Sequence, residues 1–242
     1  MKKYAPLIAR QSKRTMYYKG IRQKADSNLH EQIVSYITTA YKGAKLNILD
    51  WGCGEGALSE RLADAGHNVT SVDIDEKSFK SNKASFACID FNNSLEVRNF
   101  IEQNKQKFDL IISVEVIEHI KSPWEFISDL RALNADILIT TPNIASWWGR
   151  VWFFLTGEIW GFGKESWYEI GHINPITKVE LESILYENNF EIVSIFMGGC
   201  LPIIWAYNWK RFFLSIFILP FRLIMKGPRD GWVLCVHAKN KY

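Results

Sequence analysis

The stretch that decides the fold is Asp50-Trp51-Gly52-Cys53-Gly54-Glu55-Gly56, a glycine-rich loop between two differently patterned segments. Residues 47–50 before it form a short apolar run typical of a buried strand, and residues 57–65 after it have the apolar spacing of a helix. Strand, glycine loop and helix form the first half of a βαβ unit. Glycines let the backbone approach a ligand closely, and a helix start presents free N–H groups to it.

The alternation of strands and helices continues along the chain. Helices are predicted near 28–41, from Ser122 and from Thr177, and strands at 68–72, 86–89, 108–114, 135–141, 190–197 and 231–238. Asn28-x-x-Glu31 and Thr177-x-x-Glu180 predict capping boxes at two helix starts. The pattern indicates an α/β fold, a doubly wound Rossmann-like sheet with helices on both faces.

Residues 1–242 are expected to form one domain, because no segment has the composition of an interdomain linker. Within it we distinguish an N-terminal arm and helix (1–44), a core (45–142) and two aromatic-rich insertions (143–175 and 199–230). Both insertions follow strand ends, where open α/β sheets bind their ligands. They are therefore expected to roof or gate a substrate site.

The glycine spacing bears on the cofactor. It is G-x-G-x-G, whereas the dinucleotide fingerprint requires G-x-G-x-x-G, so it favours S-adenosylmethionine over NAD. Asp73 ends the second strand, where an acid hydrogen-bonds ribose hydroxyls in either case. Asp90-Phe91, after the third strand, can offer a carboxylate to the adenine amino group and a ring to its face. The predicted cofactor-binding residues are Asp50, Gly52, Cys53, Gly54, Gly56, Asp73, Ile74, Asp90, Phe91 and Glu115.

The glycine loop, the acid after the second strand and the acid after the third strand together resemble the class I S-adenosylmethionine-dependent methyltransferases. The resemblance covers about residues 45–197. It implies an enzyme in which a nucleophile attacks the sulfonium methyl group in line. Alignment of the two reactants can then supply several kcal/mol of the barrier.

A second motif, Glu115-Val116-Ile117-Glu118-His119, follows the fourth strand directly. If this segment turns helically, Glu115, Glu118 and His119 share one face. Two carboxylates and an imidazole could bind Mg²⁺ or Mn²⁺. Alternatively, His119 could act without metal as the general base for a hydroxyl, or Glu118 and His119 could only brace the cofactor pocket.

This E-x-x-E-H motif resembles that of the ubiquinone-biosynthesis O-methyltransferases and of the small-RNA 3′-end 2′-O-methyltransferases. In the latter, two glutamates and two histidines hold a metal, and His172 in Gly171-His172-Ile173-Asn174-Pro175 matches the second histidine. The resemblance implies Glu115, Glu118, His119 and His172 as metal ligands, beside the strand end Thr141-Pro142-Asn143. It also implies His119, His172 and Glu115 as catalytic residues.

Seven of the ten tryptophans lie between Trp147 and Trp209. Segments 146–162 and 199–226 combine aromatic residues with scattered Lys and Arg, a composition typical of membrane-interfacial segments. Their longest apolar run, 212–221, is shorter than the ~20 residues that span a bilayer. The ubiquinone-pathway enzymes are similar, with a lipid-interacting insertion after the fifth strand. A substrate lid or a homodimer face would also use such residues.

Charge and cysteine content bear on partners and location. The net charge is only +3, and although residues 1–24 form a cationic strip, the basic residues form no obvious RNA-binding module, so nucleic acid is not the expected partner. The four cysteines, Cys53, Cys88, Cys200 and Cys235, form no C-x-x-C pair, and the amino terminus has no apolar signal region. A cytoplasmic protein is expected, peripheral at the inner face of a membrane.

The predicted function is O-methylation, with S-adenosylmethionine, of a hydroxyl on a small-molecule substrate that is lipid-linked, quinone-like or a glycan. Three alternatives remain open at this point. They are an RNA 2′-O-methyltransferase, a non-catalytic protein that binds the cofactor, and an NAD-linked enzyme.

Overall fold

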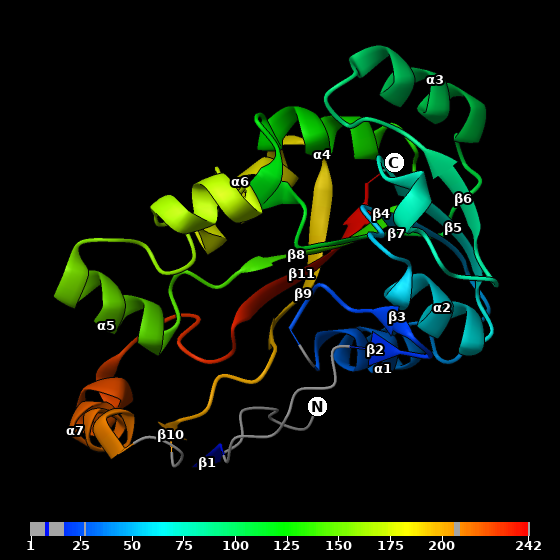
Figure 1. The fold of residues 1–242 in the computed structure, drawn as a ribbon. Coiled ribbons are helices and arrows are strands. Elements are labelled where there is room, and N and C mark those ends of the chain that lie inside the picture. Colours follow the sequence, from blue (N-terminus) through cyan, green and yellow to red (C-terminus); the bar gives the residue numbers. More distant parts are fainter. Residues whose placement is uncertain (1–7, 10–16, 27, 206–208, 242) are drawn as a thin grey trace.

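A computed structural model describes residues 8–9, 17–26, 28–205 and 209–241 (Figure 1). In chain order its elements are β1 (Ile8–Ala9), β2 (Tyr17–Tyr18), β3 (Ile21–Arg22), α1 (Leu29–Ala40), β4 (Asn47–Trp51), α2 (Ala57–Asp64), β5 (Asn68–Asp73), η1 (Glu76–Ser78), β6 (Ser85–Cys88), α3 (Ser94–Asn104), β7 (Leu110–Val114), η2 (Ile117–His119), α4 (Pro123–Arg131), β8 (Asp136–Pro142), α5 (Trp147–Thr156), η3 (Ser166–Ile170), α6 (Lys178–Glu187), β9 (Phe190–Gly198), β10 (Ile204–Trp205), α7 (Trp209–Ile224) and β11 (Val233–Asn240).

The central sheet has seven strands in the order β6-β5-β4-β7-β8-β11-β9. The strands from β6 to β8 are parallel, and β11 runs antiparallel to both β8 and β9. The strand order reverses between β4 and β7, which pair directly, Asp50 opposite Ile112. This switch point brings the glycine loop after β4 and the E-x-x-E-H segment after β7 to the same edge of the sheet, where α/β proteins bind ligands.

Helices cover both faces of the sheet because successive strand residues point to opposite sides. Ile48 packs with α1 and α2 on one face, and its neighbour Leu49 packs with α3, α4 and α6 on the other. The predicted doubly wound α/β sheet is thereby confirmed, and each predicted strand and helix lies within about two residues of an observed one.

One of the two predicted capping boxes forms. The Thr177 hydroxyl accepts from the Glu180 N–H, and the Glu180 carboxylate accepts from the Thr177 N–H. The capping box at Asn28 was wrong, although α1 begins where expected. Asn28 has φ −112° and ψ 2° instead of the extended backbone of a cap, and its side-chain amide donates to the sulfur of Cys200.

The two aromatic-rich insertions, predicted at 143–175 and 199–230, pack against each other, and we call residues 143–171 and 209–232 of the structure the roof. The side-chain amide of Asn143, at the end of β8, donates to the carbonyls of Pro228 (2.7 Å) and Gly231 (3.1 Å), which lie between α7 and β11. Trp147 and Trp148 of α5 pack against Ile218 of α7 in a buried cluster. Among the described residues, no helix is long and apolar enough to cross a membrane.

His30 gives the fold a testable pH dependence. Burial, and then the charge of Arg61, lower the pKa of His30 from 6.5 to about 3. A histidine with a lowered folded-state pKa stabilises the fold fully above pH 6.5, and this contribution is lost as the pH falls toward 3. Between pH 7 and pH 5 the loss is about 2 kcal/mol, since one pKa unit corresponds to about 1.4 kcal/mol. In urea unfolding, His30→Gln should reduce the pH 7 to pH 5 difference by about that amount; equal differences in both proteins would contradict the assignment.

Candidate methyl-transfer site

The glycine loop needs glycine for conformation and for space. Gly52, Gly54 and Gly56 have φ of 89°, 55° and 86°, which residues with side chains rarely adopt. A Cβ at Gly52 would lie 2.3 Å from Cγ2 of Val116, and one at Gly56 would lie 2.6 Å from Cε2 of Phe79. The loop is therefore packed directly onto the segment that carries the E-x-x-E-H motif.

Asp50 holds the start of this loop against α2. It is buried, and its carboxylate accepts a 2.6 Å hydrogen bond from the hydroxyl of Ser59 on α2. Burial raises its pKa to about 7, against the lowering effect of the Ser59 hydrogen bond. Burial also raises the pKa of the Cys53 thiol, so this cysteine is not a ready nucleophile. Among the described residues, the carboxylate of Asp50 is therefore hydrogen-bonded to α2 through Ser59.

The acids after β5 and β6 lie beside the loop. Asp73 accepts a 2.8 Å hydrogen bond from the N–H of Gly54, which ties the end of β5 to the loop, and the following Ile74 is exposed. Asp90 accepts from the N–H of Asn92 (2.9 Å) in the turn after β6. The predicted cofactor residues thus come from neighbouring strand ends, as required for one extended nucleoside site.

Phe91 lies flat on Trp51, with ring centroids 4.8 Å apart and an interplanar angle of 16°. The two rings line a cleft with residues of α3 and α4, among them Val97 and Phe126. The cleft gives the Asp90-Phe91 turn an apolar wall, which suits the predicted contact with an adenine face.

Glu115 does not share a helical face with Glu118 and His119, and that prediction was wrong. The helical turn η2 begins only at Ile117, and Glu115 has φ 53°, so its backbone turns the other way. The Glu115 N–H is held by both the carbonyl and the hydroxyl of Thr140, each at 3.1 Å. Burial, and then the nearby Asp26, raise the pKa of Glu115 to about 7.

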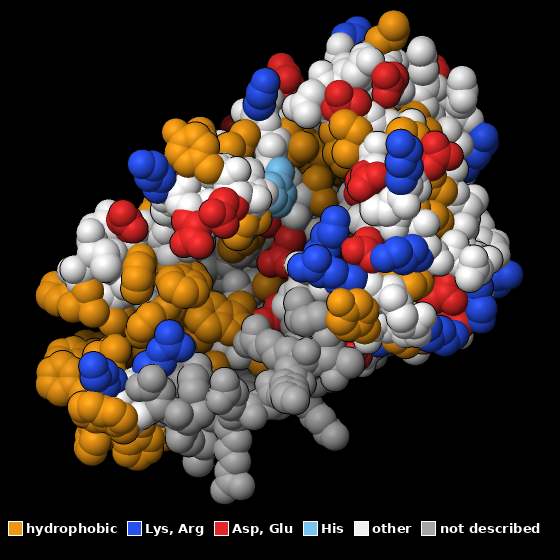
Figure 2. Space-filling model, in the orientation of Figure 1, with side chains coloured by type: hydrophobic (Ala, Val, Ile, Leu, Met, Phe, Trp, Pro, Cys, Tyr) orange, Lys and Arg blue, Asp and Glu red, His pale blue; other side chains and the backbone are white. Residues whose placement is uncertain are grey.

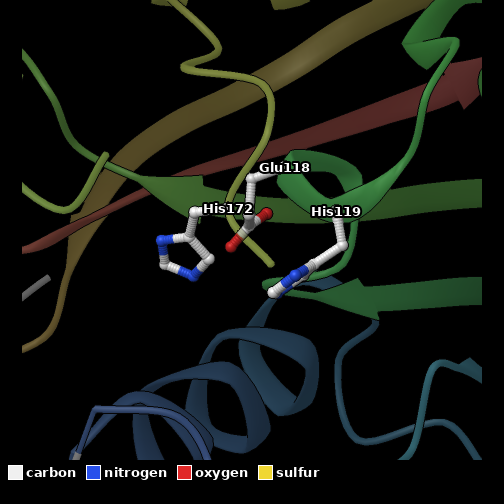
Figure 3. Close-up of side chains that lie close together, drawn as sticks. All are labelled: Glu118, His119 and His172. Atoms are coloured by element: carbon white, nitrogen blue, oxygen red, sulfur yellow. The ribbon is translucent and has the colours of Figure 1, made fainter. Parts of the chain in front are cut away.

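The structure brings together Glu118, His119 and His172, which we call the site triad (Figure 3). One potential ligand atom from each lies within 4.8 Å of those of the other two, and Glu115 is not part of this group. Glu118 is fully buried, and neither carboxylate oxygen has a close hydrogen-bond partner among the described residues, although the Thr141 hydroxyl is near enough to lower the pKa of the carboxyl. Burial, and then the charge of Glu115, raise the pKa of Glu118 well above its usual range.

Both histidines are oriented by backbone carbonyls. Nδ1 of His119 lies 3.0 Å from the carbonyl oxygen of Gly171, and Nδ1 of His172 lies 2.8 Å from that of Gly161. Since a carbonyl can only accept, we assign the proton of each neutral ring to Nδ1, which leaves the lone pair on Nε2. Burial, and then His172, lower the pKa of His119, so His119 is favoured as the neutral ring.

The triad has the chemistry of a divalent metal site. A buried carboxylate without a hydrogen-bond partner is costly unless a cation or a proton compensates it. Two imidazoles whose Nδ1 atoms are bound by backbone carbonyls have the usual orientation of metal-binding histidines. The same two lone pairs could accept a proton from a hydroxyl without a metal.

Several features of the site could not be predicted from residue types. The carbonyls of Gly161 and Gly171 orient the histidines, and a carbonyl leaves no signal in the sequence except that glycine is typical of turns. Asp26, which faces Glu115, precedes α1 and belongs to no motif. Of the cationic strip, Lys2, Lys3, Arg10, Lys13 and Arg14 lie outside the described residues.

The comparison with known families supplies the identification. A methyltransferase domain matches residues 18–195, which include the glycine loop and all three residues of the triad. The chain belongs to this family of methyltransferases.

The methyltransferase is 33% identical over 134 residues to a ubiquinone biosynthesis O-methyltransferase of Rickettsia felis, covering 51% of this chain and 53% of the relative. It is 36% identical over 105 residues to the mitochondrial ubiquinone biosynthesis O-methyltransferase of Arabidopsis thaliana, covering 40% of this chain and 33% of that protein. The matches therefore span about half or less of these relatives.

Solved structures agree on the fold. A SAM-dependent methyltransferase from Archaeoglobus fulgidus superimposes with a TM-score of 0.57 at 19% identity, covering 87% of this chain and 94% of that one. The plantazolicin methyltransferase BpumL, solved with a triazolic analog and SAH, superimposes with a TM-score of 0.55 at 21% identity, covering 88% of this chain and 83% of that one. The predicted class I S-adenosylmethionine-dependent methyltransferase is confirmed in family and fold.

Proposed function

We propose that this methyltransferase transfers the methyl group of S-adenosylmethionine to a hydroxyl oxygen of a small molecule. The observation that carries the proposal is the site triad. A buried carboxylate and two carbonyl-oriented imidazoles stand next to the glycine loop, at the switch point of the sheet. A hydroxyl needs help to lose its proton before or during methyl transfer, and these groups supply that help.

The cofactor would lie along the ends of β4, β5 and β6. Asp73, which now accepts from the Gly54 N–H, would bind the ribose hydroxyls, and Asp90 and Phe91 would contact the adenine. The methionine part would lie along the glycine loop, whose shape depends on the packing of Gly52 against Val116 and of Gly56 against Phe79. Glu115, whose N–H is held by Thr140, directly follows β7 at the same edge of the sheet.

Glu118, His119 and His172 would hold a divalent metal, Mg²⁺ or Mn²⁺, through one carboxylate oxygen and two Nε2 atoms. The metal, when bound, would lower the pKa of an acceptor hydroxyl as it does that of water. The chain's own part is to keep both imidazoles in one tautomer and to exclude water around the buried Glu118. Glu115 lies outside the group, so we do not include it among the proposed ligands.

The acceptor class follows from the relatives and from the roof. The similar proteins named above are ubiquinone biosynthesis O-methyltransferases, which suggests a quinone-like ring with an apolar chain. The aromatic roof would offer an apolar path for such a chain. A lipid-linked glycan would also fit an apolar roof beside a hydroxyl site.

Transfer of a labelled methyl group tests the function. The protein is incubated with S-[methyl-¹⁴C]-adenosylmethionine and, separately, a quinol with an apolar chain, a lipid-linked glycan and an RNA oligonucleotide. We expect an O-methyl ether on the quinol and no label in RNA. Label in the RNA 2′-hydroxyl would replace this proposal, and no label in any acceptor would overturn it.

We further propose that the roof contacts a membrane surface. α7 differs from an ordinary surface helix, because Ser215 and Arg222 are buried beside Ile218 whereas most of its large apolar side chains are exposed. Figure 2 shows hydrophobic side chains gathered at the end of the molecule that α5 and α7 occupy. The exposed members are Phe153, Phe154, Leu155, Trp160, Trp209, Phe212, Phe213, Ile216, Phe217, Phe221, Leu223 and Ile224. Lys210 and Arg211 at the start of α7 suit an anionic headgroup layer.

Vesicle flotation tests this contact. The protein should float with anionic phosphatidylserine vesicles at low salt, and the double variant Phe213→Glu/Phe217→Glu should remain at the bottom of the gradient. The matched control, Leu95→Glu/Val179→Glu, places the same charges at equally exposed apolar positions on α3 and α6 and should float like the parent. A parent protein that does not float, or two double variants that behave alike, would refute membrane contact through the roof.

A further inference from the structure

The turn Ile159–Phe162 joins the roof to the site triad. Its first and last residues are linked by a 3.0 Å hydrogen bond from the N–H of Phe162 to the carbonyl of Ile159. Gly161, in the third position, has φ 83°, the sign that a type II turn requires there. A Cβ at Gly161 would meet nothing within 4 Å, so glycine is needed for conformation and not for space.

Three successive residues of this turn have different contacts. The Trp160 ring packs among Trp148 (5.9 Å between centroids), Trp152 (5.3 Å) and Trp232 (5.9 Å). The Gly161 carbonyl accepts from Nδ1 of His172, and the Phe162 ring lies against the His172 ring at 5.2 Å. The turn therefore anchors in the tryptophan cluster on one side and holds the imidazole on the other.

The cluster connects both insertions. Trp148 and Trp152 belong to α5, Trp160 follows α5, and Trp232 lies between α7 and β11. The N–H of Trp147 donates to the carbonyl of Arg229 (2.8 Å), which adds a backbone link between the same two segments. Both insertions therefore fix the position of Trp160. Trp160 directly precedes Gly161, whose carbonyl binds the His172 ring.

We propose that Trp160 is a positioning residue that acts through the Gly161 carbonyl to keep the proton of His172 on Nδ1. With the turn in place, the proton of His172 stays on Nδ1 and the lone pair lies on Nε2. Without the Trp160 anchor the turn is released, and His172 can place its proton on either nitrogen. This inference rests on the proposed function for its effect on turnover, but its effect on His172 itself is independent of that function.

Long-range ¹H–¹⁵N NMR of histidine-labelled protein at pH 8 separates the two tautomers of a neutral imidazole. The chain has five histidines, so the His172 signals can be assigned from a His172→Gln sample. In the parent we expect His172 protonated on Nδ1, and in Trp160→Ala a mixture of both tautomers. Methyl transfer should fall about 10- to 100-fold in Trp160→Ala, the usual cost of removing support behind a ligand, with cofactor affinity unchanged.

Three further variants separate positioning from general damage. Trp160→Phe keeps an aromatic ring in the cluster and should restore the parent pattern in large part. Gly161→Ala strains the turn through its backbone and should give the same mixture of tautomers as Trp160→Ala. It keeps the proposal testable if Trp160→Ala does not fold. Phe154→Ala removes an exposed ring of α5 and should leave His172 as in the parent.

A parent His172 protonated on Nε2, an unchanged tautomer in both Trp160→Ala and Gly161→Ala, or the same mixture in Phe154→Ala would each overturn the proposal. A parent that transfers no methyl group but whose His172 responds as expected would refute the proposed function and leave the positioning role intact.

Discussion

Gly52→Ala is expected to weaken the binding of S-adenosylmethionine at least about 30-fold, because both backbone strain (about 1–2 kcal/mol) and overpacking (about 1–3 kcal/mol) oppose the native loop. The φ of 89° is unfavourable for alanine, and the new Cβ would lie 2.3 Å from Cγ2 of Val116. Val116 cannot move freely, since it lies between Glu115, which Thr140 holds, and the turn η2. Calorimetric titration with S-adenosylmethionine and S-adenosylhomocysteine measures the loss.

Gly66→Ala is the matched control. Gly66 ends the α2 segment with φ 97°, and nothing lies within 4 Å of its added Cβ. This variant should lose stability by a similar backbone cost but should bind the cofactor like the parent. Parent-like affinity in Gly52→Ala would mean that the cofactor does not use this loop.

Glu118→Gln should reduce turnover about 10²- to 10⁴-fold, the range associated with losing acid–base assistance to a reacting hydroxyl. The substitution keeps the shape of the buried side chain and removes its ability to form a carboxylate, so packing of η2 should survive. Cofactor affinity should stay within a few-fold of the parent, because the cofactor contacts lie on β4, β5 and β6. Kinetics at saturating cofactor, with the calorimetric affinity alongside, separate these two effects.

Glu169→Gln provides the comparison for this variant, since Glu169 is an exposed glutamate of η3 near the same site. It should leave turnover unchanged. If Glu118→Gln also retained parent turnover, Glu118 would act only as a neutral brace within the core.

Much of the fold was predictable because its signals are local. A buried strand needs a short apolar run, and helices on both faces require the alternation found in Ile48 and Leu49. The capping box at Thr177 forms because its extended backbone suits a cap. The one at Asn28 fails because its backbone is not extended and because Glu31, which should accept from the Asn28 N–H, pairs instead with Arg61, a residue distant in sequence. Local patterns cannot include such a competitor.

The structure brings together three of the four predicted metal ligands, but not in the predicted geometry. The E-x-x-E-H spacing suggested one helical face, but the positive φ of Glu115 removes this residue from the triad. His172 was assigned by resemblance, and the structure brings it to His119 with ring centroids 4.9 Å apart. The carbonyls that orient both rings belong to Gly161 and Gly171, and Gly171 is 52 residues from His119 along the chain. Such long-range packing is visible only in three dimensions.

Methyl transfer by metal-stripped protein tests the role of the triad most directly. The protein is treated exhaustively with EDTA and assayed for O-methylation of a quinol with an apolar chain, before and after addition of Mn²⁺. We predict that the rate falls on stripping and returns with Mn²⁺ in the parent but not in Glu118→Gln. Undiminished O-methylation by the stripped parent would contradict a metal at Glu118, His119 and His172.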